Sequence, residues 1–237
     1  MELINESTTF IANGISYNIP NMRNEISKNC EYLGLNVLEI VPSIFSNEGN
    51  DIKPEIKEEI KAKLPIAIFS DKNERITISI NNNENQLNVV RSDNEARDNI
   101  TVSKLFENLL KANVEKFTKL DDVVLIYTRN VKSQDKLKLL NEEIENIEDW
   151  NKNKTFILSI PFEYNDYTVT FKIQKLIPRD KDNTDRAYQI SGAFVFDLTK
   201  VKSKQESLRK IIENYSEHKY SGLFIKKATE FMSLKYE

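Results

Sequence analysis

Strict alternation of apolar and polar residues is the feature that most limits how this chain folds. The segment from Arg75 to Ile80 has isoleucine at every second position, and Leu87 and Val89 continue the pattern after a short polar turn. The same period of two returns in three stretches of the second half, 156–162, 167–173 and 188–196. Because successive side chains of a β-strand point to opposite faces, this pattern predicts antiparallel strands with one buried and one solvated face.

Apolar residues at three- and four-residue spacing indicate amphipathic helices between and after the strands. We expect helices near 22–33, 51–63, 101–119 and 132–150, followed by two C-terminal helices. Ser203 and Glu206 have the spacing of a capping box, which predicts the start of the first C-terminal helix, and we expect a break near 220–222 before the last. Cys30 falls on the apolar side of the first helix and is expected to be a buried, inert thiol.

Three local signals place individual strands. Asn13 and Gly14 are a hairpin-turn pair, which predicts two short extended pieces within 8–19. Pro161 lies inside an alternating stretch and favours an edge position or a bulge, because proline has no N–H to donate. The run 123–127 is apolar on both faces, so we expect a central strand there.

Together these elements predict the α+β class, with antiparallel sheet meanders in two pseudo-similar halves and amphipathic helices packed on one face. We expect one domain over residues 1–237, in which the halves 1–131 and 151–237 are joined by the helix at 132–150. A chain of 237 residues, 39% of them hydrophobic, buries enough surface to fold without a disulfide or a structural metal.

The scarcity of cysteine, histidine and glycine excludes several chemistries. One Cys rules out an intramolecular disulfide and a Cys-rich zinc site, and one His rules out HExxH chemistry. The five glycines are too far apart for phosphate-binding loops of the GxxxxGK or GxGxxG type. The acidic N-terminus and the lack of a long apolar run predict a cytoplasmic protein without a membrane helix. We assign no catalytic residue, metal ligand or cofactor from the sequence.

Polar residues at the end of the expected central strand are the best candidates for a binding site. Tyr127, Arg129 and Asn130 follow an apolar run and can line a cleft, although the same residues also suit a strand that leaves the core. Lys226 and Lys227 are further candidates, because residues 151–237 carry 16 Lys and Arg against 11 Asp and Glu. This excess predicts either a basic surface for an acidic partner or an attraction between the two halves of the chain.

Three other groups have structural explanations that we prefer. His218, the only histidine, lies near a predicted helix end, where a cation interacts favourably with the helix dipole. Asp180, Asp182 and Asp185 alternate with basic residues and lack EF-hand spacing, so a solvated hairpin loop explains them better than a metal site. Residues 55–57, Glu-Ile-Lys, have the spacing of metal-dependent nucleases, but a solvated helical face accounts for them.

Two stretches, Leu125–Asn130 and Gly192–Leu198, are followed by a long helix and by Phe224 near the last turn region. They resemble a sporadically distributed, uncharacterised family of bacterial α+β proteins of similar length, and the resemblance covers most of the chain. The family has no assigned activity, and its scattered occurrence implies a mobile-element or phage-conflict setting. The meander followed by paired helices is also topologically similar to export-type chaperones that hold unfolded chains.

These observations favour a non-enzymatic cytosolic protein-binding module: an adaptor, a chaperone-like protein or an inhibitor protein. Its partner would be another protein or a second copy of the chain. Two alternatives stay open. A metal-dependent nuclease or nucleotide-processing subunit needs three or more carboxylates in one cleft. A nucleic-acid-binding accessory protein needs a continuous basic stripe across the C-terminal half.

Overall fold

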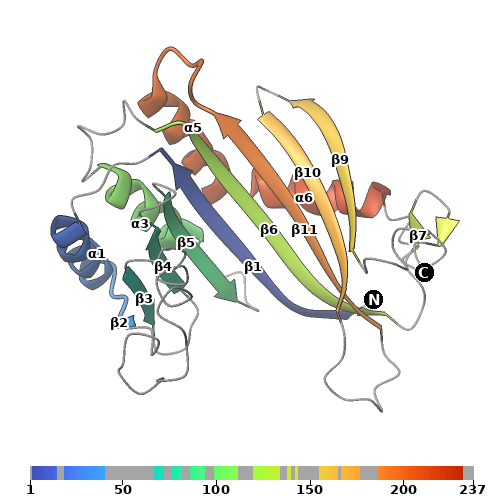
Figure 1. Ribbon diagram of the computed structural model, residues 1–237, viewed down its shortest axis with the longest axis horizontal. Helices are drawn as coiled ribbons and strands as arrows, with labels where there is room; N and C mark the ends of the chain where they lie inside the picture. Colours follow the sequence, from blue (N-terminus) through green and yellow to red (C-terminus); the bar gives the residue numbers. More distant parts are fainter. Residues whose placement is uncertain are drawn as a thin grey trace, which may run out of the picture.

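The computed structural model of the protein describes residues 2–14, 19–40, 67–71, 76–81, 86–93, 99–111, 120–133, 138–139, 142–143, 155–164, 167–176 and 186–231. The strands of its main sheet are β1 (Glu2–Asn13), β2 (Val37–Ile40), β3 (Ala67–Asp71), β4 (Ile76–Asn81), β5 (Gln86–Asp93), β6 (Asp122–Ser133), β9 (Thr155–Tyr164), β10 (Tyr167–Leu176) and β11 (Arg186–Asp197). These nine strands pair antiparallel in the order β2-β3-β4-β5-β1-β6-β11-β10-β9 (Figure 1).

Within the described ranges, the helices pack against one face of this sheet (Figure 1). They are α1 (Ile19–Tyr32), α3 (Asn99–Lys111), α5 (Lys204–Ser216) and α6 (Lys219–Phe231). Helix α3 contacts both α1 and α5, and α5 contacts α6. The predicted α+β class, with helices on one face of an antiparallel sheet, is confirmed.

The alternation in the sequence corresponds to the two faces of the sheet. In β4, Ile76, Ile78 and Ile80 are buried under the helices, whereas Thr77 and Ser79 on the other face are only partly buried. The capping box also works as predicted, because Ser203 Oγ accepts a hydrogen bond from the Glu206 amide at 3.3 Å. The helix that begins there buries Leu208, Ile211, Ile212 and Tyr215.

Aromatic side chains connect the helices to the centre of the sheet. The ring of Phe10 on β1 stacks on Phe106 of α3, with 4.6 Å between centroids, and meets the edge of Tyr215 of α5 at 4.4 Å. Tyr127 on β6 stacks on Phe224 of α6 at 5.8 Å. All these rings are almost completely buried, so they supply much of the apolar contact between the two layers.

The predicted division into two pseudo-similar halves joined by a helix at 132–150 is not confirmed. β1 lies between β5 and β6, and β6 pairs with β11, so strands from both parts of the chain form one sheet. β6 continues to Ser133, opposite Arg186, and a small ladder of β7 (Lys138–Leu139) and β8 (Glu142–Glu143) follows it. The described residues of the predicted helix, 132–133, 138–139 and 142–143, are therefore in strands, and the rest of 134–150 lies outside the described part of the chain.

The expected hairpin at Asn13 and Gly14 is wrong, because both edges of β1 are already occupied by β5 and β6. Gly14 ends the strand with a φ of 79°, and α1 begins at Ile19. The expected break at 220–222 lies earlier, since α6 begins at Lys219. Pro161 is in β9, an edge strand whose register shifts beside it, so both predicted features are confirmed.

Two predicted features lie outside the described residues: the helix at 51–63, which contains the Glu-Ile-Lys tripeptide, and the loop with Asp180, Asp182 and Asp185. The run 123–127 is confirmed as an interior strand, next to β1 at the middle of the sheet. None of the helices described is both long enough and apolar enough to cross a membrane.

Replacing Phe10 by alanine tests the aromatic contact between the layers. Phe10→Ala should lower the free energy of unfolding by about 3–5 kcal/mol, because a fully buried ring is removed from a packed site. Leu38→Ala is the control, since Leu38 is 58% exposed on the edge strand β2 and should change stability by less than about 0.5 kcal/mol. Urea unfolding measures the free energy of unfolding of both variants. Equal losses in the two variants would contradict this packing.

Cys30 offers a test of burial by chemical reactivity. The side chain is 1% exposed, and burial raises the pKa of its thiol to about 12. At pH 8 the thiolate should be on the order of 10³-fold scarcer in the native protein than in the unfolded chain, so labelling by a disulfide reagent should be at least that much slower. Equal labelling rates in buffer and in urea would contradict a core position.

Candidate functional site

A row of polar residues interrupts the apolar face of the sheet beneath the α5–α6 corner. Arg91 on β5, Thr8 on β1 and Tyr127 on β6 are directly opposite one another in the strand register. The neighbouring row is apolar, with Val89, Phe10 and Leu125 in the equivalent positions of the same strands. Buried apolar residues continue beyond this row on β6 and β11, at Val131, Ile190 and Tyr188, so the row interrupts the core face.

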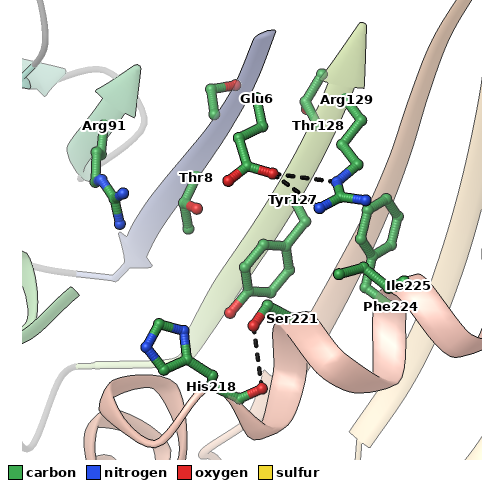
Figure 2. A pocket seen from close by; sticks show the side chains of 11 residues that line it. Glu6, Thr8, Arg91, Tyr127, Thr128, Arg129, His218, Ser221, Phe224 and Ile225 are labelled. Carbon is green, nitrogen blue, oxygen red and sulfur yellow. Dashed lines mark hydrogen bonds and ion pairs between the residues drawn. The ribbon is translucent and has the colours of Figure 1, made fainter. Parts of the chain in front are cut away.

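A pocket of about 170 Å³ opens where the polar row meets α6 (Figure 2). The sheet contributes Glu6, Ser7, Thr8, Arg91, Tyr127, Thr128 and Arg129, and the helical corner contributes His218, Ser221, Phe224 and Ile225. Its volume resembles that of cavities that accept a benzene-sized group. The lining combines charged, hydroxyl and apolar groups, which is typical of a site that orients a ligand.

Tyr127 is the most unusual residue of this pocket. Its side chain is only 6% exposed, and its enclosed hydroxyl oxygen has no hydrogen-bond partner among the residues described. The ring is fixed between Phe224, Phe194 and Tyr215, and Figure 2 shows the hydroxyl directed toward Ser221 and His218. Leaving a buried hydroxyl unpaired costs about 1–3 kcal/mol, so its presence requires an explanation.

Burial raises the pKa of Tyr127 far above its usual value, and the neighbouring Tyr215 and Tyr220 raise it further. Arg91 opposes this rise through its positive charge, whereas the Glu6 carboxylate adds to it. Tyr127 is therefore a neutral phenol at every physiological pH. It can donate a hydrogen bond, but it cannot act as a base or as a phenolate nucleophile.

Tyr215 gives a direct comparison, because it is another buried tyrosine over the same row. Burial raises its pKa, while hydrogen bonds with Arg91 and Thr8 and the charge of Arg91 lower it. Its hydroxyl is thus satisfied by the polar row. Arg91 is itself only 7% exposed, so the row holds a positive charge inside the protein.

Glu6 and Arg129 form the second charged element of the pocket. They are opposite each other in the β1–β6 register, and Arg129 donates from Nε and Nη2 to Glu6 Oε2 at 3.1 and 3.0 Å. Both side chains are about 30% exposed, so the ion pair lies partly in solvent. A cross-strand pair of this kind contributes about 0.2–1 kcal/mol.

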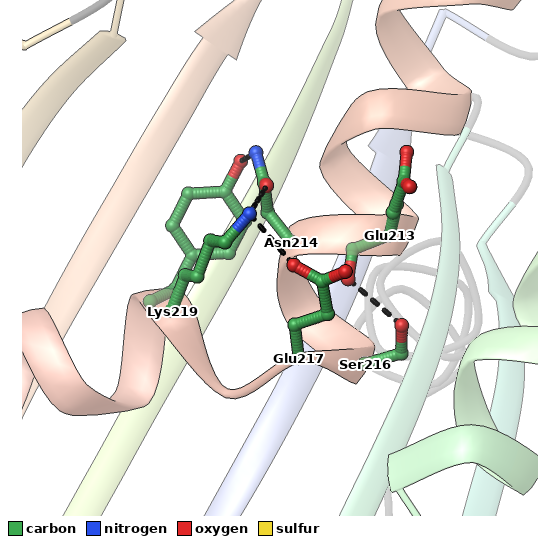
Figure 3. A network of polar contacts seen from close by, with 6 residues as sticks. Glu213, Asn214, Ser216, Glu217 and Lys219 are labelled. Atoms are coloured by element: carbon green, nitrogen blue, oxygen red, sulfur yellow. Dashed lines mark hydrogen bonds and ion pairs between the residues drawn. The ribbon is translucent and has the colours of Figure 1, made fainter.

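The corner between α5 and α6 forms the opposite wall. His218 has a φ of 58°, a left-handed conformation that is uncommon outside glycine and lets the chain turn from one helix into the next. A polar network holds the corner (Figure 3): Lys219 Nζ contacts Glu217 Oε2 at 2.6 Å and Asn214 Oδ1 at 3.1 Å. Asn214 in turn donates to the Tyr220 hydroxyl at 3.3 Å.

The hydroxyl of Ser221, which lines the pocket with His218, donates its hydrogen bond to the backbone and not to the imidazole. Ser221 Oγ donates to the backbone carbonyl of His218 at 3.0 Å, as an ordinary helix-turn hydrogen bond. Among the described residues of the lining, Glu6 is the carboxylate, and Arg91 and Arg129 are the arginines. No group of three His, Cys, Asp or Glu residues that could hold a metal occurs within the described ranges.

Only some of the residues predicted to bind line the pocket. Tyr127 and Arg129 both line the pocket. Asn130 is on the other face of β6, where it donates to Asn5 at 2.7 Å and accepts from Gln189 at 3.2 Å. Lys226 is exposed on α6, and Lys227 belongs to the same helix, with its side chain outside the described part.

Several described lysines of the C-terminal part contact acidic or carbonyl groups. Lys200, Lys210 and Lys219 form ion pairs with Asp197, Glu206 and Glu217, respectively. Lys204 donates to the backbone carbonyl of Leu120. These contacts place carboxylates or carbonyls beside the basic groups that a nucleic-acid interface would use.

Sequence reasoning missed Glu6, Thr8 and Arg91, although the alternation contained the signal. Arg91 continues the inward period of Leu87 and Val89, so the pattern places a charged side chain on the core face. A charge at a core position is costly unless it is paired or used, and that cost could have marked it as a candidate. Arg91 and Tyr127 lie in one row because each pairs with Thr8 on β1. This strand register joins three segments that are distant in the chain, so it cannot be predicted from one sequence.

Comparisons with known proteins add little. No protein-family model matches the chain, and no curated protein matches it. Among solved structures, the duplicated taurocyamine kinase from Schistosoma mansoni matches with a TM-score of 0.38 and 10% identity. The match covers 90% of this chain but only 33% of the kinase chain. A likeness this low transfers neither activity nor ligands to the protein.

Removing the Tyr127 hydroxyl should not destabilise the protein. Tyr127→Phe keeps the ring contacts and deletes a buried group without a partner, so the free energy of unfolding should stay the same or rise by up to about 1 kcal/mol. Tyr215→Phe is the matched control, because it leaves hydrogen-bonding groups of Arg91 and Thr8 behind. We expect it to cost about 1–3 kcal/mol.

Urea unfolding of the two variants beside the unmodified protein measures this difference. A loss of stability in Tyr127→Phe as large as that in Tyr215→Phe would mean that the Tyr127 hydroxyl already has a partner inside the protein, and it would contradict an unpaired donor in the pocket.

Proposed function

We propose that the protein is a binding module without catalytic activity of its own, and that it recognises a protein partner at the pocket under the α5–α6 corner. The observation that carries the proposal is the buried hydroxyl of Tyr127, which faces the pocket wall without a partner among the described residues. Binding a group from outside would satisfy this hydroxyl, and so the cost of burying it would be recovered in the complex.

The size of the pocket supports a polypeptide partner. A volume of about 170 Å³ suits one side chain or one chain terminus rather than a nucleotide or a large cofactor. Interfaces between proteins commonly have such anchor pockets, each filled by one residue of the partner and surrounded by weaker contacts.

Exposed aliphatic residues near the pocket support the same interpretation. Ile225 lines the pocket and is 38% exposed, and Leu3 is 44% exposed at the start of β1. Leu3 pairs with Val131, two residues beyond Arg129 on β6. Protein interfaces combine apolar contacts with polar groups around them, and this pocket with its exposed aliphatic neighbours offers both.

The nuclease and nucleic-acid alternatives receive less support from this site. A nuclease needs several carboxylates in one cleft, and this pocket contributes one that is paired with Arg129. Lys200, Lys210 and Lys219 of the C-terminal part are paired with carboxylates. We also propose that the protein is cytosolic. A role in mobile-element or phage conflict is part of the proposal only because of the family resemblance.

Site-specific photo-crosslinking in the cytosol of the source organism tests the proposal. Ile225 is replaced by p-benzoylphenylalanine in the full-length chain, and Leu38, exposed on the edge strand β2, is replaced as the matched control. We expect one crosslinked polypeptide of fixed mass from position 225 and little from position 38. The crosslink should weaken when Tyr127→Phe is added, although this variant remains folded.

Native mass spectrometry of the same preparations can contradict the proposal. A bound small molecule of constant mass, with no polypeptide crosslinked at position 225, would contradict a protein-binding function. Equal crosslinking at positions 225 and 38, insensitive to Tyr127→Phe, would show that the pocket is not the recognition site.

A further inference from the structure

We propose that the protein forms a symmetric dimer in which the open face of its main sheet packs against the same face of a second copy. The open face is the side of the sheet opposite the helices, and no described helix or strand covers its central strands (Figure 1). The inference goes beyond the proposed function, because the α5–α6 corner that walls the pocket is on the helical side. It depends on the charge, the composition and the size of the open face.

The outward residues of the four central strands, β5, β1, β6 and β11, carry no charge over several rows. Val89, Phe10, Leu125 and Phe194 are buried under the helices, so the residues that alternate with them point to the open face. In the ranges 88–92, 5–11, 124–130 and 189–195, all of these outward residues are uncharged, and each is partly or fully exposed. Charged residues make up 30% of the whole chain, so this face is unlike its average surface.

Aliphatic side chains form the centre of the open face. In the strand register they are Ile11, Val124 and Val195 in one row, and Val90, Ile126 and Ala193 in the next. Thr9 lies between Val90 and Ile126 in the second row. All of them remain partly exposed in the single chain. Contiguous apolar surface of this kind is stabilised when a partner removes it from water.

Polar residues without charge border the aliphatic centre. The register continues with a hydroxyl row, Ser7, Thr128 and Ser191, and then with an amide row, Asn5, Asn130 and Gln189. Asn130 donates to Asn5 at 2.7 Å and accepts from Gln189 at 3.2 Å. These amides therefore have partners within the sheet, which lowers the cost of covering them. An apolar centre with a polar border is the usual organisation of a protein interface.

The lack of charge favours a second copy as the occupant. In a symmetric dimer the face meets itself, so a charged residue would lie close to charges of its own sign and repel them. A nucleic acid or a strongly charged protein would instead be recognised by complementary charges, which the outward residues of these rows do not carry. Two copies also share the same right-handed sheet twist, which lets their faces stack about 10 Å apart with strands within about 30° of each other.

The size of the sheet suits a stable dimer. The strands β4, β5, β1, β6, β11 and β10 are consecutive neighbours in the sheet. At about 4.8 Å between strands and about 3.3 Å per residue, six strands with about seven residues each cover roughly 650 Å². Two such faces would bury about 1,300 Å² together, within the range of about 1,200–2,000 Å² that stable interfaces bury. The dimer would leave both pockets accessible on its outer sides.

Sedimentation equilibrium of the purified full-length protein tests the dimer. We expect a mass of twice 27.6 kDa at about 100 µM, with reversible dissociation on dilution. Thr9→Lys introduces a charge at the aliphatic centre, so its dissociation constant should rise at least about a hundredfold. Thr9→Val keeps the shape without a charge and should dimerise at least as tightly. Tyr32→Lys is the matched control, since Tyr32 is 83% exposed at the end of α1 and should leave the dimer unchanged.

A second measurement applies even if Thr9→Lys does not fold. Ile126 is replaced by p-benzoylphenylalanine in one preparation and Tyr32 in another, and the purified proteins are irradiated. We expect a covalent product of two chains from position 126 and little from position 32, because only the first lies on the open face. Tyr127→Phe should change neither the dimer nor this product, since its hydroxyl is on the helical side (Figure 2).

Three results would overturn the inference. The first is a mass of one chain at every concentration, and the second is a dimer that persists in folded Thr9→Lys or dissociates equally in Tyr32→Lys. The third is the absence of a two-chain product from position 126. None of them bears on the crosslink to a partner at position 225, so a failure of the dimer and a failure of the proposed function are distinguished.

Discussion

The contact of aromatic rings between the sheet and the helices is the interaction on which the rest of this structure depends. Phe10 lies between Phe106 of α3 and Tyr215 of α5, and Tyr127 lies between Tyr215 and Phe224 of α6. These contacts join three helices to the two central strands, β1 and β6. Large buried rings combine apolar burial with a preferred geometry, so they determine both how strongly the helices bind to the sheet and where they lie.

The same contacts explain where a pocket forms within this layer. The aromatic rows fill the space under the helices as far as Phe10 and Leu125, and the next row along the strands is polar. Tyr127 belongs to both regions: its ring is part of the aromatic packing and its hydroxyl extends into the polar row. Fixed rings hold that hydroxyl in one place, which is the preorganisation that selective binding requires.

Local sequence patterns predicted much of the fold but only part of the candidate site. The alternation in β4, the capping box at Ser203 and the edge position of Pro161 each depend on a few neighbouring residues, so one sequence was enough to predict them. Strand order depends on pairing between distant segments. β1 inserts between β5 and β6, which no local signal indicates, and the hairpin was therefore predicted wrongly.

Prediction of the site from the sequence was limited for the same reason. Tyr127 and Arg129 were found because both follow one apolar run on a single strand, but Arg91, Thr8 and Glu6 reach them only through the register of three strands. A tyrosine in this position could be phenylalanine without loss of packing, and phenylalanine would avoid an unpaired buried hydroxyl. Stability therefore gives no reason for the hydroxyl, and a bound acceptor does, which is why the functional proposal starts from this one oxygen atom.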